Sequence, residues 1–477
     1  MSTRQPLTLT SLPITMPYGA HLHEGEVRIN NASNLARHMR PLAKLANFGN
    51  RAEQAWAQWL IRELSLLSGI YPASLHNLYG AMARGELPKQ FTLPAINLRG
   101  LTFDLALAAF RQAKNRNAGA IIFELARSEK GYTGQNLRQY AASIFAAAIA
   151  AGWTGPVFVQ GDHFQIKASK FATDPDDEVR VIQDLILEAF DAWIYNIDVD
   201  TSTLVDLSQR TLRLQQRANA VWTAHFLNWI RANQPIGVHV SVGGEIGEVG
   251  MQNSTTRELI AYMTELELAL GRKPDLSKIS IQTGTRHGGI KLPDGSMAPV
   301  QLDTRAMRLV GNYARDHHEM IIVQHGASTS SDKTFPVIRI AGAGECHLAT
   351  DFMTRLLDNV PLGIAGDMKR WLLANGHLPK EKQTEAQWWH DVAKQALGAH
   401  SQAIWSMPEW NRGQAVLDVE RRFELIFEAF DIADTAPLVA QFAPLTYNLP
   451  NPRPDETGEL EGDAPTKIAD DVSGLAD

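Results

Sequence analysis

The feature that most constrains the fold is an alternation of short apolar β-type runs with amphipathic helical patterns from Phe91 onward. Eight such runs occur, at Leu93–Leu98, Ala120–Leu125, Pro156–Gly161, Ala192–Val199, Gly237–Gly243, Ile279–Thr283, Met320–Gln324 and Val337–Ala341. Strands that alternate with helices form parallel βα units, and eight is the number of units that closes a barrel. The sequence therefore predicts an α/β fold of the (β/α)₈ TIM-barrel type.

A doubly wound open sheet is the competing arrangement of alternating strands and helices. Such sheets often carry a G-x-G-x-x-G motif after the first strand, and none follows Leu93–Leu98. The barrel is therefore favoured.

The remaining segments suggest additions at both ends of the barrel. We expect residues 1–85 to form an N-terminal arm with helices, residues 86–355 the barrel, and residues 356–447 a tryptophan-containing helical extension. Residues 448–477 are rich in Pro, Asp, Glu and Gly, a composition typical of a disordered acidic tail.

Composition excludes several classes of protein. Apolar residues make up 44% of the 477 residues and charged residues 20%, so a large core is available and full disorder is excluded. The formal net charge of -7 argues against a nucleic-acid partner. The single cysteine, Cys346, precludes an intramolecular disulfide and suggests a reducing, cytoplasmic compartment. We expect no signal peptide and no membrane span, because the N-terminus is polar and no run of about 18 apolar residues occurs.

Polar side chains follow the predicted strands, at the end of the barrel where catalytic groups lie. In chain order they are Asp162 and His163, Asp198, Glu245, His287 and His325. A single histidine at a strand end is usually a hydrogen-bonded rim residue. Three that converge on one rim, each beside glycine or another small residue, suit a catalytic Zn²⁺ site, because zinc takes imidazole and carboxylate ligands and keeps one position open.

The order of the motifs resembles the class II, zinc-dependent fructose-bisphosphate aldolase family over roughly residues 85–355. The similar stretches are Leu93–Asn97, Gly161–His163, Glu245–Gly247, Gly284–Gly288 with Lys291, and Val323–Ser328. Each motif is weak alone, but the ordered set is specific.

The resemblance implies a lyase that cleaves or forms a C–C bond of a ketose phosphate through a metal-stabilised enediolate. It implies that His163, His287 and His325 bind Zn²⁺, that Glu245 is a further ligand, and that Asp198 is a possible second metal position. A monovalent cation is a possible further cofactor. Asp162 would be the general acid/base. The residues expected at the substrate or its phosphate are Gly288, Lys291, Gly326, Ser328, His347, Thr350 and Asp351. We also expect a homo-oligomer.

Three positions in the predicted last strand and its continuation depart from the family pattern. Glu345, His347 and Ala349 stand where the pattern has Lys, Asn and Asp. The family's glutamate in the loop after Glu245 has no clear counterpart, since Glu248 lies nearer to Glu245 than the expected place. Arg412 is our candidate for the arginine that binds the distal phosphate. A Glu345 that pointed into the site would repel an anionic substrate. We therefore expect poor cleavage of fructose 1,6-bisphosphate and preference for another ketose phosphate.

Two other functions remain open at this point. One is a metal-dependent hydrolase on the same barrel type, since a fold does not determine the chemistry. The other is a non-catalytic aldolase-like subunit that supports a partner enzyme. Asp162 also has an alternative role, as a carboxylate that only orients the ring of His163.

Overall fold

The computed structural model describes residues 12–246, 252–285, 288–298, 302–446, 449–455 and 457–459. Its centre is a closed barrel of eight parallel strands, in which each strand pairs with the next and the last pairs with the first. The strands are β4 (Leu93–Asn97), β5 (Ile122–Ala126), β6 (Gly155–Gln165), β7 (Asn196–Asp200), β8 (Ser241–Glu245), β9 (Lys278–Ile281), β10 (Ile321–Gln324) and β11 (Ala343–Leu348). The predicted (β/α)₈ barrel is confirmed.

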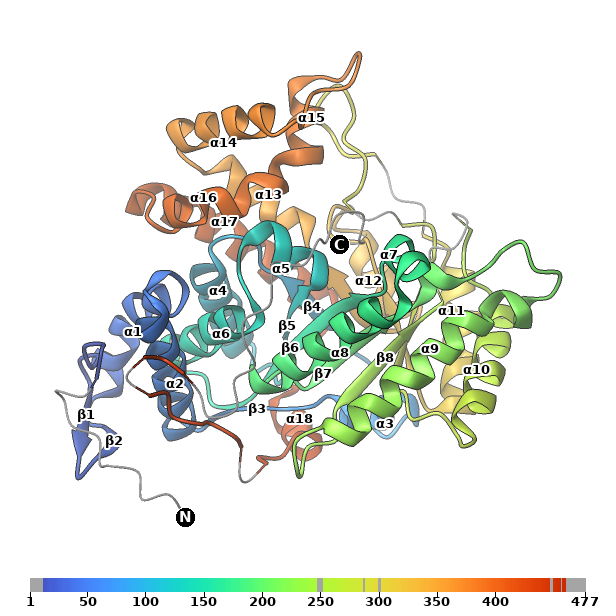
Figure 1. Ribbon diagram of the computed structural model, residues 1–477, viewed down its shortest axis with the longest axis horizontal. Coiled ribbons are helices and arrows are strands. Elements are labelled where there is room, and N and C mark those ends of the chain that lie inside the picture. Colours follow the sequence, from blue (N-terminus) through green and yellow to red (C-terminus); the bar gives the residue numbers. More distant parts are fainter. Residues whose placement is uncertain are drawn as a thin grey trace.

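Helices surround the barrel (Figure 1). They are α4 (Thr102–Asn115), α5 (Arg127–Thr133), α6 (Leu137–Ala151), α7 (Ala168–Thr173), α8 (Pro175–Asp191), α9 (Leu212–Asn233), α10 (Thr256–Leu270), α11 (Thr304–His318), α12 (Thr334–Ile340) and α13 (Thr350–Asp358). Helix α8 shows how the sequence specifies them. The Asp174 side chain caps its N-terminus, Pro175 occupies the first turn, and Ile182 and Ile186 lie on its buried face.

The predicted position of the last strand, Val337–Ala341, is wrong. Residues up to Ile340 form α12, which buries Phe335 and Ile338 and exposes Val337 and Ile340. This spacing belongs to a helix, and a short apolar run does not by itself distinguish a helix from a strand. The true strand, β11, is inconspicuous because it carries two polar side chains, Glu345 and His347, that face the barrel interior.

The N-terminal segment adds a layer outside the barrel. A hairpin of β1 (Ala20–His23) and β2 (Glu26–Ile29) precedes α1 (Ala32–Phe48) and α2 (Arg51–Leu67). These two helices pack on α6, where Asn47 donates a hydrogen bond to Ser143 at 2.9 Å. Strand β3 (Ile70–Pro72) then pairs with the outer edge of β6, and α3 (His76–Ala83) leads into the barrel.

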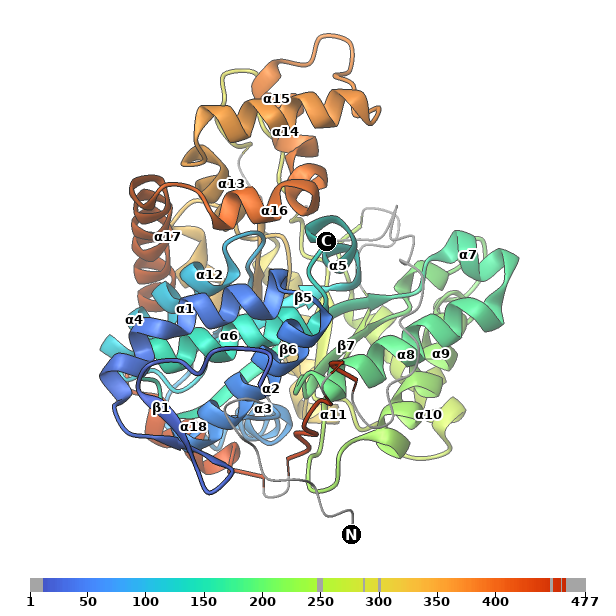
Figure 2. The same ribbon diagram turned by 60° about the vertical axis from the view of Figure 1, so that its left-hand side comes forward.

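The C-terminal extension comprises α14 (Leu362–Ala374), α15 (Glu385–Val392), a 3₁₀ turn (Ala393–Ala396), α16 (Leu397–Trp405), α17 (Glu409–Ala429) and α18 (Ala436–Phe442). Its first helices, α14 to α16, stand over the end of the barrel at which the strands finish, whereas α17 packs beside α4 and α18 lies at the opposite end, near α3 (Figure 2). The buried Trp405 anchors the extension, because its indole donates to Gly100 O at 2.6 Å and its own carbonyl accepts from Arg40 at 2.8 Å.

The first part of the segment expected to be a disordered tail packs against the rest of the protein. Trp193 donates a hydrogen bond to Pro450 O at 2.7 Å, and Trp56 donates to Asp455 O at 2.8 Å. Residues 460–477 lie outside the described part of the chain.

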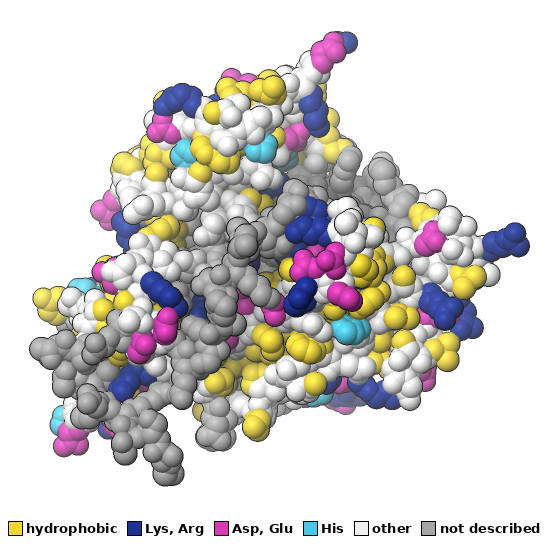
Figure 3. Space-filling view, in the orientation of Figure 1, with side chains coloured by type: hydrophobic (Ala, Val, Ile, Leu, Met, Phe, Trp, Pro, Cys, Tyr) yellow, Lys and Arg dark blue, Asp and Glu magenta, His cyan; other side chains and the backbone are white. Residues whose placement is uncertain are grey.

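None of the helices described combines the length and the apolarity needed to cross a membrane. On the face in Figure 3, Lys and Arg side chains form separate groups, several of them beside Asp or Glu, and not one continuous basic surface.

We expect Trp405→Ala to lower the free energy of unfolding by about 3–5 kcal/mol, the usual cost of removing a buried indole. Trp410 is the matched control, because it lies five residues further along and is 74% exposed. Denaturant titrations of the two variants measure the difference. Equal losses would show that Trp405 does not anchor the extension.

Candidate functional site

A β-bulge in β6 directs two neighbouring side chains toward the same space. The register with β7 shifts between Gly161 and Phe164, and His163 has a left-handed backbone with φ of 40°. Adjacent residues of a regular strand point to opposite faces, but a bulge re-aims one of them. Asp162 and His163 are therefore both buried in one cluster, at a strained conformation of the kind found at functional sites.

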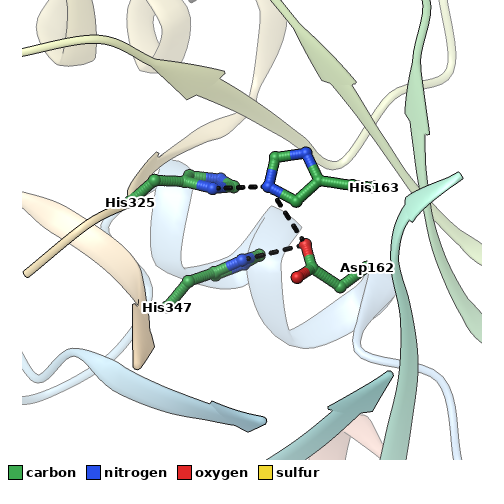
Figure 4. Close-up of side chains that lie close together, drawn as sticks. All are labelled: Asp162, His163, His325 and His347. Atoms are coloured by element: carbon green, nitrogen blue, oxygen red, sulfur yellow. Dashed lines mark hydrogen bonds and ion pairs between the residues drawn. The ribbon is translucent and has the colours of Figure 1, made fainter. Parts of the chain in front are cut away.

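Four buried side chains converge at this point: Asp162, His163, His325 and His347 (Figure 4). His163 Nε2 lies 3.0 Å from His325 Nδ1 and 3.5 Å from Asp162 Oδ1. His347 Nδ1 lies 3.2 Å from the same Asp162 oxygen. His325 directly follows β10 and His347 belongs to β11, so three separate strand segments supply the cluster.

The outer nitrogen of each imidazole contacts an oxygen. His163 Nδ1 lies 3.3 Å from Glu245 Oε2 and 3.5 Å from Asp200 Oδ2, His325 Nε2 lies 3.0 Å from Ser280 Oγ, and His347 Nε2 lies 2.5 Å from Glu345 Oε1. Histidines that bind metals usually donate their other N–H to a carboxylate or another oxygen, which determines the tautomer and the ring orientation. The inner nitrogens thus have the arrangement that a metal ion requires.

The electrostatic field of the cluster favours positive charge. Burial lowers the pKa of His163, but Asp162 and Glu245 outweigh burial and raise it well above its usual range. The same holds for His347, whose pKa burial lowers and Glu124 and Asp162 raise. A field that stabilises an imidazolium also stabilises a cation placed between the rings. Together with the nitrogen and oxygen donors, it makes the cluster fit Zn²⁺.

Beneath the imidazoles lies a fully buried lysine, Lys278 of β9. Its ammonium is 2.9 Å from Asp198, 2.7 Å from Glu345 Oε1 and 2.7 Å from Gln160 Oε1. Gly243 makes room for this group, because a Cβ there would lie 2.4 Å from Asp198 Oδ1 and 3.0 Å from Lys278 Cε. Burial raises the pKa of Asp198 to about 6, even though Lys278 opposes that effect.

The geometry changes the interpretation of Glu345. The side chain points into the barrel and is completely buried, but Lys278 neutralises it and the Tyr79 hydroxyl donates to it. Burial raises the pKa of Glu345, and Lys278 and His347 more than offset it, so the pKa lies well below its usual range. Lys278 therefore offsets the negative charge of Glu345 inside the barrel. This removes the reason for expecting Glu345 to repel an anionic substrate.

The structure brings some of the other predicted metal residues to the cluster. Glu245 contacts the edge of His163 that faces away from His325. Asp198 pairs with Lys278 and belongs to none of the groups with metal-ligand spacing among the described residues. His287 lies outside the described residues.

A cavity of about 340 Å³ lies between the barrel rim and the extension. Its lining is Arg99, Gly288, Gly289, Thr350, Met353, Leu378, Lys380, Gln383, His390, Asp391, Val392 and Lys394. Two predicted phosphate residues, Gly288 and Thr350, are part of it. Hydrogen bonds connect it to the cluster: Arg99 donates to Glu129 at 2.6 Å, and Asn97 donates to Glu129 at 2.9 Å and to Asp162 at 3.2 Å.

The remaining predicted substrate residues are not part of this lining. Buried Arg422 of α17 contacts Asp351 at 2.6 Å and donates to Ser328 O at 3.2 Å, so it clamps the segment after Gly326 to the start of α13. The carbonyl of Lys291 accepts from Gln387 at 3.0 Å. Arg412, our candidate for the distal phosphate, faces Asp104 at 3.6 Å instead.

Sequence reasoning missed several residues of the site. Asp200 follows Asp198 by two positions in β7, and this period would have placed it on the same interior face. Glu124 stands within an apolar run and Lys278 directly before one, and a charged residue at such a position signals a polar barrel interior. Lys380 and Lys394 carried no signal, because only the packing of the extension brings them to the rim.

A family comparison agrees with this geometry. The model of the family described as "Fructose-bisphosphate aldolase class-II" matches residues 82–406, more than half of the chain. The chain belongs to this family. It is a divergent member, since a solved structure with a similar fold shares only 12% sequence identity with it. No curated protein sequence matches the chain significantly.

Three solved structures resemble the chain at low sequence identity. A probable tagatose 6 phosphate kinase from Sinorhizobium meliloti 1021 has a TM-score of 0.55 and 12% identity, over 71% of this chain and 100% of the other. The fructose-bisphosphate aldolase from Campylobacter jejuni has a TM-score of 0.48 and 17% identity, over 77% and 97%. The YdjI aldolase from Escherichia coli K12 has a TM-score of 0.45 and 13% identity, over 77% and 99%. The first of these supports the barrel fold. Family membership, in turn, supports an aldolase-type lyase.

We expect Lys278→Met to destabilise the protein by about 3–5 kcal/mol at neutral pH, because it removes the buried cation that contacts both Asp198 and Glu345. Burial already raises the pKa of Asp198, and the loss of the ammonium should raise its folded-state pKa further above the unfolded-state value. The free energy of unfolding should therefore increase as the pH falls through this raised pKa and decrease as the pH rises through it. Denaturant unfolding at several pH values tests this. Exposed Lys273, which contacts Glu319 at 3.3 Å, is the control, and a similar loss there would contradict the assignment.

Proposed function

We propose that the protein is a zinc-dependent aldolase that cleaves or forms a C–C bond of a ketose phosphate. The observation that carries this proposal is the convergence of His163 and His325 with Asp162 on one point inside the barrel, with imidazole nitrogens 3.0 Å apart. A bound Zn²⁺ would polarise the ketose carbonyl and stabilise the charge that develops when the bond breaks. Family membership supports the reaction class.

Asp162 would move the proton at the substrate hydroxyl next to the cleaved bond. Asn97 donates to its Oδ2 at 3.2 Å, and Glu129 and Arg99 hold Asn97 in turn, so the carboxylate has a defined orientation. Burial raises the pKa of Asp162, but His163 and His347 outweigh it and keep the pKa low, so the group is an anion able to accept a proton.

The cavity above the rim would hold the anionic end of the substrate. It combines three cations, Arg99, Lys380 and Lys394, with the left-handed glycines Gly288 and Gly289 and the first residue of α13, Thr350. A helix N-terminus and backbone N–H groups near cationic side chains are a general way to bind phosphate. With His347 and Ala349 in place of the family's Asn and Asp, we propose a ketose phosphate other than fructose 1,6-bisphosphate as the preferred substrate.

The main test compares the wild type with Asp162→Asn. We expect the wild type to contain zinc, to lose activity on chelation, and to cleave at least one member of a panel of ketose mono- and bisphosphates. Asp162→Asn should keep the zinc and lose about 10²-fold or more in kcat, the usual scale for a missing acid/base group.

Asp206→Asn, a substitution at an exposed loop, serves as the control and should be fully active. Zinc without cleavage of any substrate would favour a non-catalytic subunit. Near-normal turnover in Asp162→Asn would leave Asp162 as a carboxylate that orients His163.

The cavity has its own test. We expect Lys380→Ala and Lys394→Ala each to raise KM for a phosphorylated ketose about tenfold, since a hydrogen bond to a charged group contributes about 1.5 kcal/mol or more. Unphosphorylated analogues should be much less affected. Lys382→Ala is the control, because Lys382 is close in sequence and outside the lining. Equal KM changes for phosphorylated and unphosphorylated sugars would contradict phosphate binding here.

A further inference from the structure

Two departures from the family pattern, Glu345 and His347, lie two residues apart in β11 and contact each other. We propose that His347 is a further imidazole ligand of the ion held by His163 and His325, and that Glu345 is the carboxylate that orients its ring. The inference rests on the proposed function for the identity of the ion as zinc. It changes the role of His347, which the resemblance placed at the substrate.

The geometry of the donors carries the proposal. Asp162, His163, His325 and His347 can each direct one donor atom into a group in which all lie within 4.8 Å of one another. Zinc–nitrogen bonds of about 2.0 Å in a tetrahedron separate neighbouring ligand atoms by about 3.3 Å. The one recorded separation between two of the imidazole nitrogens, His163 Nε2 to His325 Nδ1, is 3.0 Å and lies near this value. Asp162 Oδ1 lies 3.2 Å from His347 Nδ1 and 3.5 Å from His163 Nε2, so the three nitrogens surround one space. Figure 4 shows the His347 ring directed at the same point as the other two rings.

Hydrogen bonding supports the same assignment. His347 Nδ1 and Asp162 Oδ1 are both buried and have no hydrogen-bond partner among the described residues. A buried polar atom without a partner costs about 1–3 kcal/mol, so such atoms are uncommon in native structures. An ion bound to His347 Nδ1 would use the lone pair of that nitrogen, beside the carboxylate of Asp162.

Glu345 provides what a ligand histidine needs on its other side. Its Oε1 lies 2.5 Å from His347 Nε2, and Lys278 and Gln160 hold that same oxygen at 2.7 and 3.0 Å. A lysine at position 345, as in the family pattern, has no acceptor and could not bind an imidazole N–H. The glutamate at 345 and the histidine at 347 therefore function together, and Lys278 supplies the positive charge to the barrel interior.

The decisive experiment is a competition for Zn²⁺ between the protein and a chromophoric chelator. We expect His347→Asn, which restores the family residue, to weaken zinc affinity at least tenfold, as His325→Asn should. In the Co²⁺-substituted protein the same change should shift the visible absorption bands, because these depend on the ligand set. His400→Asn is the matched control, since His400 lies on α16 and bonds Ala396 O.

A second variant tests the proposal independently in case His347→Asn does not fold. Glu345→Gln keeps the size of the side chain and leaves His347 in place. It should weaken zinc affinity about 10- to 100-fold, the usual effect of losing a carboxylate that orients a ligand. Circular dichroism checks the fold of each variant. If both variants keep the wild-type zinc affinity and cobalt spectrum, and His347→Asn only raises KM, then His347 contacts the substrate and the proposal is wrong.

These outcomes separate the inference from the proposed function. A protein that loses zinc in His347→Asn but cleaves no ketose phosphate would keep the ligand assignment and refute the aldolase. If the protein is an active aldolase and neither His347→Asn nor Glu345→Gln changes its zinc affinity, the proposed function stands and the ligand assignment is wrong.

Discussion

The structure depends on the balance of charge inside its barrel. Carboxylates from several strands are buried in a space that excludes water, among them Glu124, Asp162, Asp198 and Glu345. Unpaired buried charges are very costly, so such a barrel is stable only when cations or shared protons offset them. Lys278 meets this need in the lower layer. In the upper layer the histidines do so, either protonated or as ligands of a metal ion.

Local backbone strain places the chemistry where this charge is concentrated. The bulge at Asp162 and His163 lets a strand present two functional groups to one point, at the cost of a left-handed φ of 40° for a residue with a side chain. The chain accepts this strain because the neighbouring strands constrain the bulge on both sides. The result is a rigid centre, in which each imidazole is held from behind by an oxygen.

The barrel and the C-terminal extension contribute different groups of residues to the site. The barrel supplies the cluster of three imidazoles from β6, the residue after β10, and β11, whereas the extension supplies Lys380 and Lys394 to the cavity above it. Trp405 and Arg422 dock the two parts to each other through hydrogen bonds to backbone carbonyls. The lining of this cavity can therefore change through helices remote from the strands, while the histidine cluster stays intact.

The sequence alone determined the barrel, the order of its motifs and the position of Asp162, His163 and His325 at strand ends, because the strand period and the polar residues that follow each apolar run are local properties. Only the tertiary structure decided the position of β11, whose interior-facing Glu345 and His347 conceal its strand pattern, and the neutral environment of Glu345 beside Lys278. It likewise decided that Arg99, Lys380 and Lys394 share one cavity. Those features depend on which side chains meet across the closed barrel and its extension, and no short stretch of sequence contains that information.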